Sequence, residues 1–154
     1  MTRYKYFPEN KLKLRWIIID KIKNKEYDLN DIDVYGLTDL SETFHKLDIM
    51  ENNQFKDYIT LDISKWDVSK CKNFEAMFAG ASYIKFDLSE WDVSSGEIFD
   101  DMFAFAGKYY KREFVGIENW DVSNAKSMAG MFNGCSNWNQ DISNWNVSNV
   151  KDFS

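Results

Sequence analysis

A tetrapeptide motif, Trp followed by Asp or Asn and then by Val and Ser, recurs along this chain of 154 residues. Its copies are Trp66–Ser69, Trp91–Ser94, Trp120–Ser123 and Trp145–Ser148. The first three tryptophans are each followed, twelve residues later, by a phenylalanine: Phe78, Phe103 and Phe132. Self-similarity with a period of about 20 to 50 residues is typical of proteins that stack one repeat on the next. We therefore expect the large residues of all repeats to share one core and the surface positions to recur in columns.

The residues between the motif copies predict what each repeat contains. Ile59–Ile63 and Ile84–Leu88 alternate apolar and polar residues, which is the pattern of a short, half-buried strand. Asn73–Gly80 has apolar residues at helical spacing and ends in glycine, which favours a short helix or a 3₁₀ turn. The sequence thus predicts one short strand and one short helix per coil.

The N-terminal residues predict a helix that covers the first coil. Residues 10–25 have helical periodicity, with Asn10 as the N-cap. One stripe of this helix comprises Leu12, Trp16, Ile19 and Lys23, and a neighbouring apolar set comprises Leu14, Ile17, Ile18 and Ile22. Because the first coil has no upstream neighbour, we expect the apolar face to cover it and the lysines to face water. The predicted domains are a cap helix over residues 1–28 and a solenoid of about four repeats over residues 29–154, the last one incomplete.

The net charge of −6 is distributed unevenly. Residues 1–25 carry eight Lys and Arg against Glu9 and Asp20, which gives +6, whereas residues 26–154 carry eleven against 23 acids, which gives −12. A basic first segment on an acidic body fits an intramolecular match, a head-to-tail contact or a nucleic-acid arm. We expect the partner to be a protein and expect no direct binding of nucleic acid.

The composition excludes several classes of protein. No run of 18 apolar residues occurs, so we expect no membrane span. The N-terminal residues lack the apolar stretch and cleavage site of a secretory signal, so we expect a cytoplasmic location for the chain as given, or a surface location if a leader was removed. Cys71 and Cys135 are too few for a disulfide framework, and with His45 alone they do not make a zinc site.

At the repeated motifs the chain closely resembles the BspA-like leucine-rich-repeat surface proteins, which include the mycoplasma lipoprotein-associated repeat domain. The best match is Trp120–Ser136, continuing through Trp138–Trp145, and the resemblance covers about residues 29–154. It implies a leucine-rich-repeat-like solenoid that binds without catalysis, often at bacterial surfaces. The predicted fold class is therefore an α/β repeat, a short right-handed solenoid of this type with an N-terminal capping helix.

Most repeated residues have a structural interpretation. The motif tryptophans are expected in the core, because large stacked aromatic rings bury extensive apolar surface. The Asp or Asn after each Trp is expected to accept backbone N–H bonds in a turn. No nucleophile elbow, phosphate loop, metal cluster or dinucleotide fingerprint is present, so we expect no enzyme, no cofactor and no metal.

Partner-binding residues are expected beside the inward-facing strand residues and in one insertion. The strand-face candidates are Asp62, Lys65, Asp87, Glu90, Glu118, Asn119, Asp141 and Asn144. The insertion contributes Tyr109, Tyr110, Lys111 and Arg112, which combine two frequent interface residue types. For both sets a solvated or locally hydrogen-bonded surface remains the alternative.

The last repeat predicts self-association, because it has apolar residues but no following coil. These residues are Trp145, Val147, Val150 and Phe153. An open apolar end favours either a homodimer through this coil or capture of a partner there.

Two functions fit these features. The first is a non-enzymatic protein-binding module that presents an acidic solenoid surface and the Tyr/Arg loop to its partner. The second is an inhibitor encoded by a phage or mobile element, anti-CRISPR-like or otherwise anti-defence, whose acidic body blocks the basic nucleic-acid channel of a host enzyme.

Overall fold

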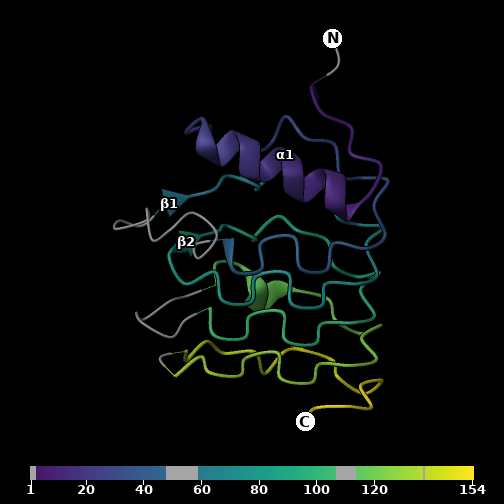
Figure 1. Ribbon diagram of the computed structural model, residues 1–154. Coiled ribbons are helices and arrows are strands. Elements are labelled where there is room, and N and C mark those ends of the chain that lie inside the picture. Colours follow the sequence, from purple (N-terminus) through teal and green to yellow (C-terminus); the bar gives the residue numbers. More distant parts are fainter. Residues whose placement is uncertain (1–2, 48–58, 107–113, 137) are drawn as a thin grey trace.

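The computed structural model describes residues 3–47, 59–106, 114–136 and 138–154. Its named elements are helix α1 (Lys11–Lys23), strands β1 (Ile59–Thr60) and β2 (Ile84–Lys85), and the 3₁₀ helix η1 (Ile117–Asn119). Strands β1 and β2 pair in parallel, with Ile59 opposite Ile84. Helix α1 lies across one end of a series of turn-rich layers, and the C-terminus lies at the opposite end (Figure 1).

The predicted α/β solenoid with one strand and one helix per coil is wrong. The described chain contains a single α-helix and a sheet of two two-residue strands. The segment 73–80, for which we predicted a short helix, is a succession of tight turns. Neighbouring layers contact through isolated parallel bridges, among them Asp39–Asn73, Asn73–Ile98, Ile98–Ser127 and Ser127–Asp152.

Alternating hydrogen bonds explain why this segment is not a helix. The N–H of Ala76 donates to Asp100 O of the next layer (2.8 Å), whereas the following N–H, of Met77, donates to Phe74 O within its own layer (3.1 Å). The next pair of donors repeats this pattern, with Ala79 N returning to Ala76 O. A helix would direct every interior N–H to the residue four positions before it. Here every second N–H is used to join layers.

The alternation requires left-handed backbone at two positions per layer, four residues apart. These positions are Glu42 and Lys46, Ala76 and Gly80, Asp101 and Phe105, and Gly130 and Gly134, with φ between 50° and 70°. Only some of these residues are glycine, so the helical spacing of the apolar side chains concealed the turns. This is the physical reason that the helix prediction failed.

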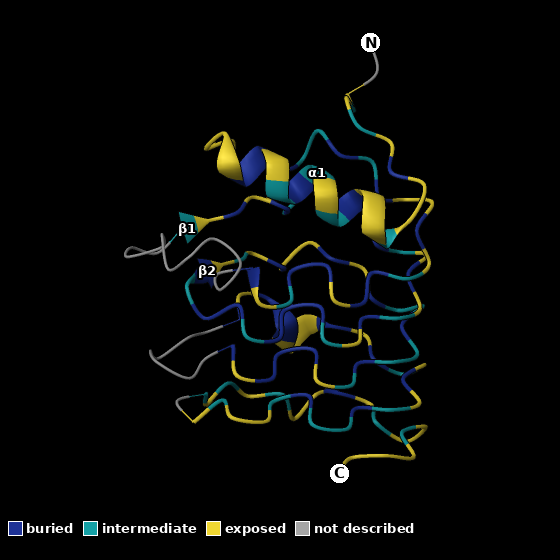
Figure 2. Cartoon of the chain, in the orientation of Figure 1, coloured by how far each residue is buried: buried dark blue, intermediate teal, exposed yellow. Residues whose placement is uncertain are grey.

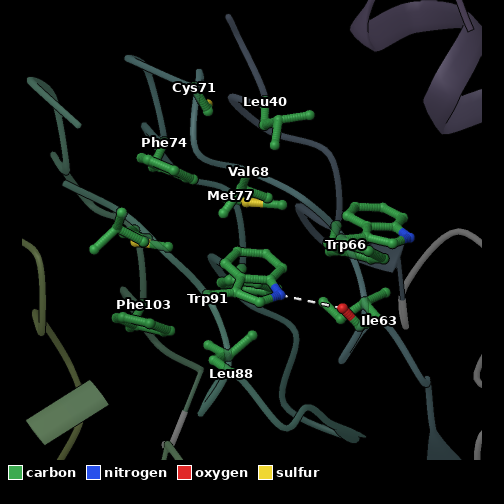
Figure 3. Close-up of a cluster of buried hydrophobic side chains, with 14 of the residues drawn as sticks. Leu40, Ile63, Trp66, Val68, Cys71, Phe74, Met77, Leu88, Trp91 and Phe103 are labelled. Carbon is green, nitrogen blue, oxygen red and sulfur yellow. Dashed lines mark hydrogen bonds between the residues drawn. The ribbon is translucent and has the colours of Figure 1, made fainter. Parts of the chain in front are cut away.

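The predicted burial of the motif tryptophans is confirmed, since all four are 4–8 % exposed. The rings of Trp66 and Trp91 are stacked, with centroids 6.4 Å apart and planes inclined by 10°. Each indole N–H also donates to a backbone carbonyl of the preceding layer, as Trp91 Nε1 does to Ile63 O at 3.1 Å (Figure 3). A parallel column of stacked rings comprises Phe44, Phe78, Phe103 and Phe132, with centroids 5.4–5.7 Å apart.

Helix α1 begins after the predicted N-cap, because the Asn10 side chain accepts a hydrogen bond from Lys13 N (3.0 Å). Only part of the expected apolar face is buried. Leu14, Ile18, Lys21 and Ile22 face the layers. The stripe of Leu12 and Trp16 faces outward instead, since these side chains are 64 % and 73 % exposed. Exposed and buried residues alternate along α1 (Figure 2).

The expectation that the lysines of this helix face water is also wrong in part. Lys21 is buried, and its ammonium group lies 3.1 Å from the carboxylates of both Glu26 and Asp31. It also lies 5.3 Å from the centre of the Tyr6 ring. Two carboxylates thus compensate a buried cation that fixes α1 to the chain around it.

Arg15 replaces the hydrogen bonds of a missing upstream layer. In the second layer, Met77 O and Ala79 O accept from Phe44 N and Lys46 N of the layer before. The corresponding carbonyls of the first layer belong to Thr43 and His45, and they accept from the two Arg15 guanidinium nitrogens at 2.9 and 2.7 Å. Helix α1 therefore caps the first layer by polar contacts as well as by apolar burial.

We predict that Arg15→Met lowers the free energy of unfolding by about 1–3 kcal/mol, because it leaves half-buried carbonyls without donors. Lys13→Met is the matched control, since Lys13 is exposed on the same helix. Urea unfolding followed by tryptophan fluorescence gives both values. Equal stability of the two variants would contradict the role assigned to Arg15.

Gly116 is required by its backbone and by its surroundings. It has φ 88°, and an added Cβ would lie 2.1 Å from Ser89 Cα. We predict that Gly116→Ala destabilises the fold by at least about 2 kcal/mol. Gly36→Ala, with no atom within 4 Å of the added Cβ, should change stability by less than about 0.5 kcal/mol. Thermal unfolding of the pair tests this, and similar melting temperatures would refute it.

Candidate protein-binding face

The predicted strand-face acids begin tight turns. Each carboxylate accepts the backbone N–H of the serine two residues later: Asp62 from Ser64 (3.0 Å), Asp87 from Ser89 (3.0 Å) and Asp141 from Ser143 (2.9 Å). All three aspartates are nevertheless exposed. They therefore stabilise the turn and still present negative charge to the solvent.

Local hydrogen bonds lower the pKa of two of these carboxylates, Asp62 and Asp141. The Asn30 side chain, together with Ser64, lowers the pKa of Asp62 below its ordinary value. The backbone N–H of Ser143 is the main cause of the lowered pKa of Asp141. At neutral pH both groups are fully charged, so the face has a fixed negative charge.

A second set of exposed acids follows the motif tryptophans. Asp67 accepts from Ser69 N (3.1 Å) and Asp92 from Ser94 N (3.0 Å), which confirms the predicted turn role of this position. In the last copy Asn146 accepts from Ser148 N (3.2 Å), so the turn does not require a charge. The charge at the earlier positions is therefore free to serve another purpose.

We use the term acidic face for the exposed carboxylates within four residues of a motif tryptophan. They are Asp62, Asp67, Asp87, Glu90, Asp92, Glu118, Asp121 and Asp141. Sequence reasoning missed Asp67, Asp92 and Asp121 as candidates because their turn role appeared sufficient. These aspartates recur directly after a buried tryptophan, and this recurrence could have identified them as candidates.

A hollow of ≈ 430 Å³ lies within this face. Its lining brings together Lys65 and Glu90, two of the predicted residues, with Asp67 and Asp92. Arg3 also lines it, which the sequence did not indicate. The hollow thus joins two adjacent layers and places charges of both signs around one depression.

The other predicted residues that the structure describes do not line this hollow. Glu118 and Asn119 are exposed in η1, and Asp141 and Asn144 are exposed in the last layer. Tyr109, Tyr110, Lys111 and Arg112 lie outside the described residues. The acidic face therefore extends over several layers. The lining of its hollow comes from residues beside the first two tryptophan motifs and from Arg3.

The predicted C-terminal residues line a larger, apolar hollow of ≈ 790 Å³. Trp145, Val147 and Phe153 contribute to it, together with Phe132 and Met131, which the sequence analysis did not include. Phe153 is 60 % exposed, whereas Trp145 is 8 % exposed. Val150 packs, partly buried, against the core rather than lining the hollow.

Other reactive groups are few among the described residues. Burial raises the pKa of the Cys71 thiol to about 12, so this thiol is protonated at neutral pH. No group of three His, Cys, Asp or Glu in the described part of the chain is arranged to hold a metal ion. Within the same residues, no helix has the length and apolar character needed to cross a bilayer.

Comparison with known proteins identifies the family but no individual relative. No curated protein and no solved structure matches the chain. The family model described as "Mycoplasma protein of unknown function, DUF285" matches residues 17–113 and 110–154, which include α1 from Ile17 onward and every copy of the tryptophan motif. The chain belongs to the DUF285 family.

Proposed function

We propose that the protein is a non-enzymatic binding module that recognises a basic protein surface through its acidic face. The observation that carries this proposal is the hollow lined by Lys65, Asp67, Glu90 and Asp92. Exposed carboxylates that are held by local hydrogen bonds lose little side-chain entropy when a partner binds. Preorganised charge of this kind favours specific recognition.

The charge distribution supports a basic partner. Residues 26–154 have a net charge of −12, which attracts a cationic surface and accelerates association. Lys65 and Arg3, on the edge of the hollow, would reject partners that are uniformly cationic. Specificity would then reside in the alternation of signs around the hollow.

The resemblance to BspA-like surface proteins favours adhesion to another protein as the biological setting. The inhibitor hypothesis rests on the same acidic charge, because a nucleic-acid channel is also a basic surface. The two settings differ in the partner: a surface or matrix protein in the first, a nucleic-acid enzyme in the second. Both use the acidic face.

The test removes charge without removing the turns. Asp67→Asn/Asp92→Asn keeps a side-chain acceptor at each turn, as Asn146 does naturally. The control Glu75→Gln/Asp101→Asn removes two exposed charges from the turn segments instead. In affinity purification from native cell extract, quantified by mass spectrometry, we expect the first variant to retain at least fivefold less partner than the wild type, and the control to retain an equal amount. Equal loss in both variants, or in neither, would exclude the acidic face.

We further propose that the C-terminal hollow mediates pairing of two copies. Residues 120–154 carry Lys126 and Lys151 against Asp121, Asp141 and Asp152, so two such ends repel each other only weakly. Apolar surface at this end, including Phe132 and Phe153, would be removed from water in the pair.

Light scattering at about 10–100 µM tests the pairing. We expect a mass of twice 18.2 kDa for the wild type and the monomer mass for Phe153→Gln, because Phe153 is exposed and contributes to the hollow. Tyr35→Gln, which changes an exposed aromatic residue outside the hollow, should stay dimeric. A wild-type monomer throughout this range would rule out the dimer.

A further inference from the structure

The outward side of α1 carries an exposed apolar stripe, formed by Leu12, Trp16 and Ile19. Leu12 is 64 % and Trp16 73 % exposed, and Ile19 is partly exposed. Phe7, in the segment that leads into the helix, is 60 % exposed. Figure 2 shows exposed residues alternating with buried residues along α1.

The exposure of this stripe contrasts with the burial of the motif tryptophans. The motif tryptophans are buried to the last few per cent and donate their indole N–H groups to carbonyls. Trp16 is the most exposed large apolar residue in the described chain, and Leu12 is the next. The fold is already capped by the other side of α1, through Leu14 and Ile18. The other side of α1 already covers the first layer, so the contiguous apolar stripe that stays exposed indicates an interaction surface.

The cations of α1 and of the residues just after it fall into two groups. Lys11 points inward to Asp39, and Arg15 points inward to backbone carbonyls. Lys21 points inward to Glu26 and Asp31. Lys13, Lys23 and Lys25 are exposed near the two ends of α1. The outward side therefore combines apolar side chains with positive charge at both ends of the helix.

We propose that this stripe docks on an anionic lipid surface. A helix that lies flat at a membrane boundary inserts Leu and Trp side chains among the headgroups, while flanking lysines contact anionic lipids. Indole suits this boundary because it is largely apolar and has one polar group. The interaction lies outside the acidic face and is independent of the function proposed above.

The uneven charge distribution favours an anionic lipid surface, rather than a nucleic acid or a second copy of the chain, as the partner of the stripe. The acidic body, with −12 over residues 26–154, is repelled by an anionic surface, so the molecule approaches with α1 foremost. A nucleic acid would match the lysines but would offer no apolar phase for Leu12. The C-terminal hollow of a second copy is nearly neutral and would leave Lys13 and Lys25 without opposite charges.

Flotation with vesicles tests the proposal. The protein is mixed with vesicles of phosphatidylcholine alone or with about 30 % phosphatidylserine. We expect binding to the phosphatidylserine vesicles that weakens at 0.5 M NaCl and on omission of phosphatidylserine. Leu12→Gln/Trp16→Gln should lower the partition coefficient at least tenfold, and Lys13→Glu or Lys25→Glu about fivefold each. Tyr35→Gln, which changes an exposed aromatic residue outside the stripe and outside the C-terminal hollow, should bind as the wild type does.

Three outcomes would overturn the proposal. The first is failure of the wild type to float with the anionic vesicles at millimolar lipid. The second is equal flotation of Leu12→Gln/Trp16→Gln and the wild type, with circular dichroism showing that both are folded. The third is a double variant whose only change is in the mass measured by light scattering, which would assign the stripe to a contact between copies.

Discussion

The structure depends on the hydrogen bonds that the turn segments of one layer donate to the following layer. In each turn segment, every second N–H donates to a carbonyl of the following layer, as Ala76 does to Asp100. The tryptophan side chains bond in the opposite sense, from Trp91 back to Ile63 O. Both sets join neighbouring layers, and the aromatic columns fill the space between them. Each layer is therefore stabilised mainly by the layers on either side, as expected for a repeat protein.

The direction of these bonds explains the composition of α1. The first layer offers carbonyls at Thr43 and His45 that no earlier layer can use, and a purely apolar helix would leave them unsatisfied. Arg15 has enough donors to serve both, and its planar guanidinium suits a row of oxygens. The basic character of the N-terminal segment is thus partly a structural requirement. This intramolecular use of charge is one of the alternatives that the sequence left open.

The sequence predicted the core better than the backbone. The motif tryptophans recur at nearly regular intervals, and large aromatic residues in such a pattern are explained by a shared core. Their spacing was therefore sufficient to predict that the indoles of Trp66, Trp91, Trp120 and Trp145 are buried. The helix prediction for segment 73–80 failed because apolar residues three and four apart fit a series of turns as well as a helix. Nothing in Ala76 or Asp101 reveals left-handed backbone, since residues other than glycine seldom adopt it. The same ambiguity affected α1, where two apolar stripes were expected to cover the layers and only the one with Leu14, Ile18 and Ile22 does so.

Only some residues of the acidic face could be identified from the sequence. Residues such as Lys65 and Glu90 were identified because they vary beside a regular column, and the structure brings both into one hollow. Asp67 and Asp92 were assigned to turns alone, although an aspartate can support a turn and remain charged at the surface. Arg3 reaches the hollow from a segment far away in the sequence, so no local pattern could have included it.

Bridge positions in successive layers are separated by unequal lengths of chain. Asp39 pairs with Asn73, Asn73 with Ile98, and Ile98 with Ser127, so the spacing changes from 34 to 25 to 29 residues while the pairing stays in register. The number of residues between bridge positions can therefore vary while the interior stays unchanged. A lineage with this architecture could gain or lose several residues between bridge positions, and so diversify its exterior, without changing the aromatic columns.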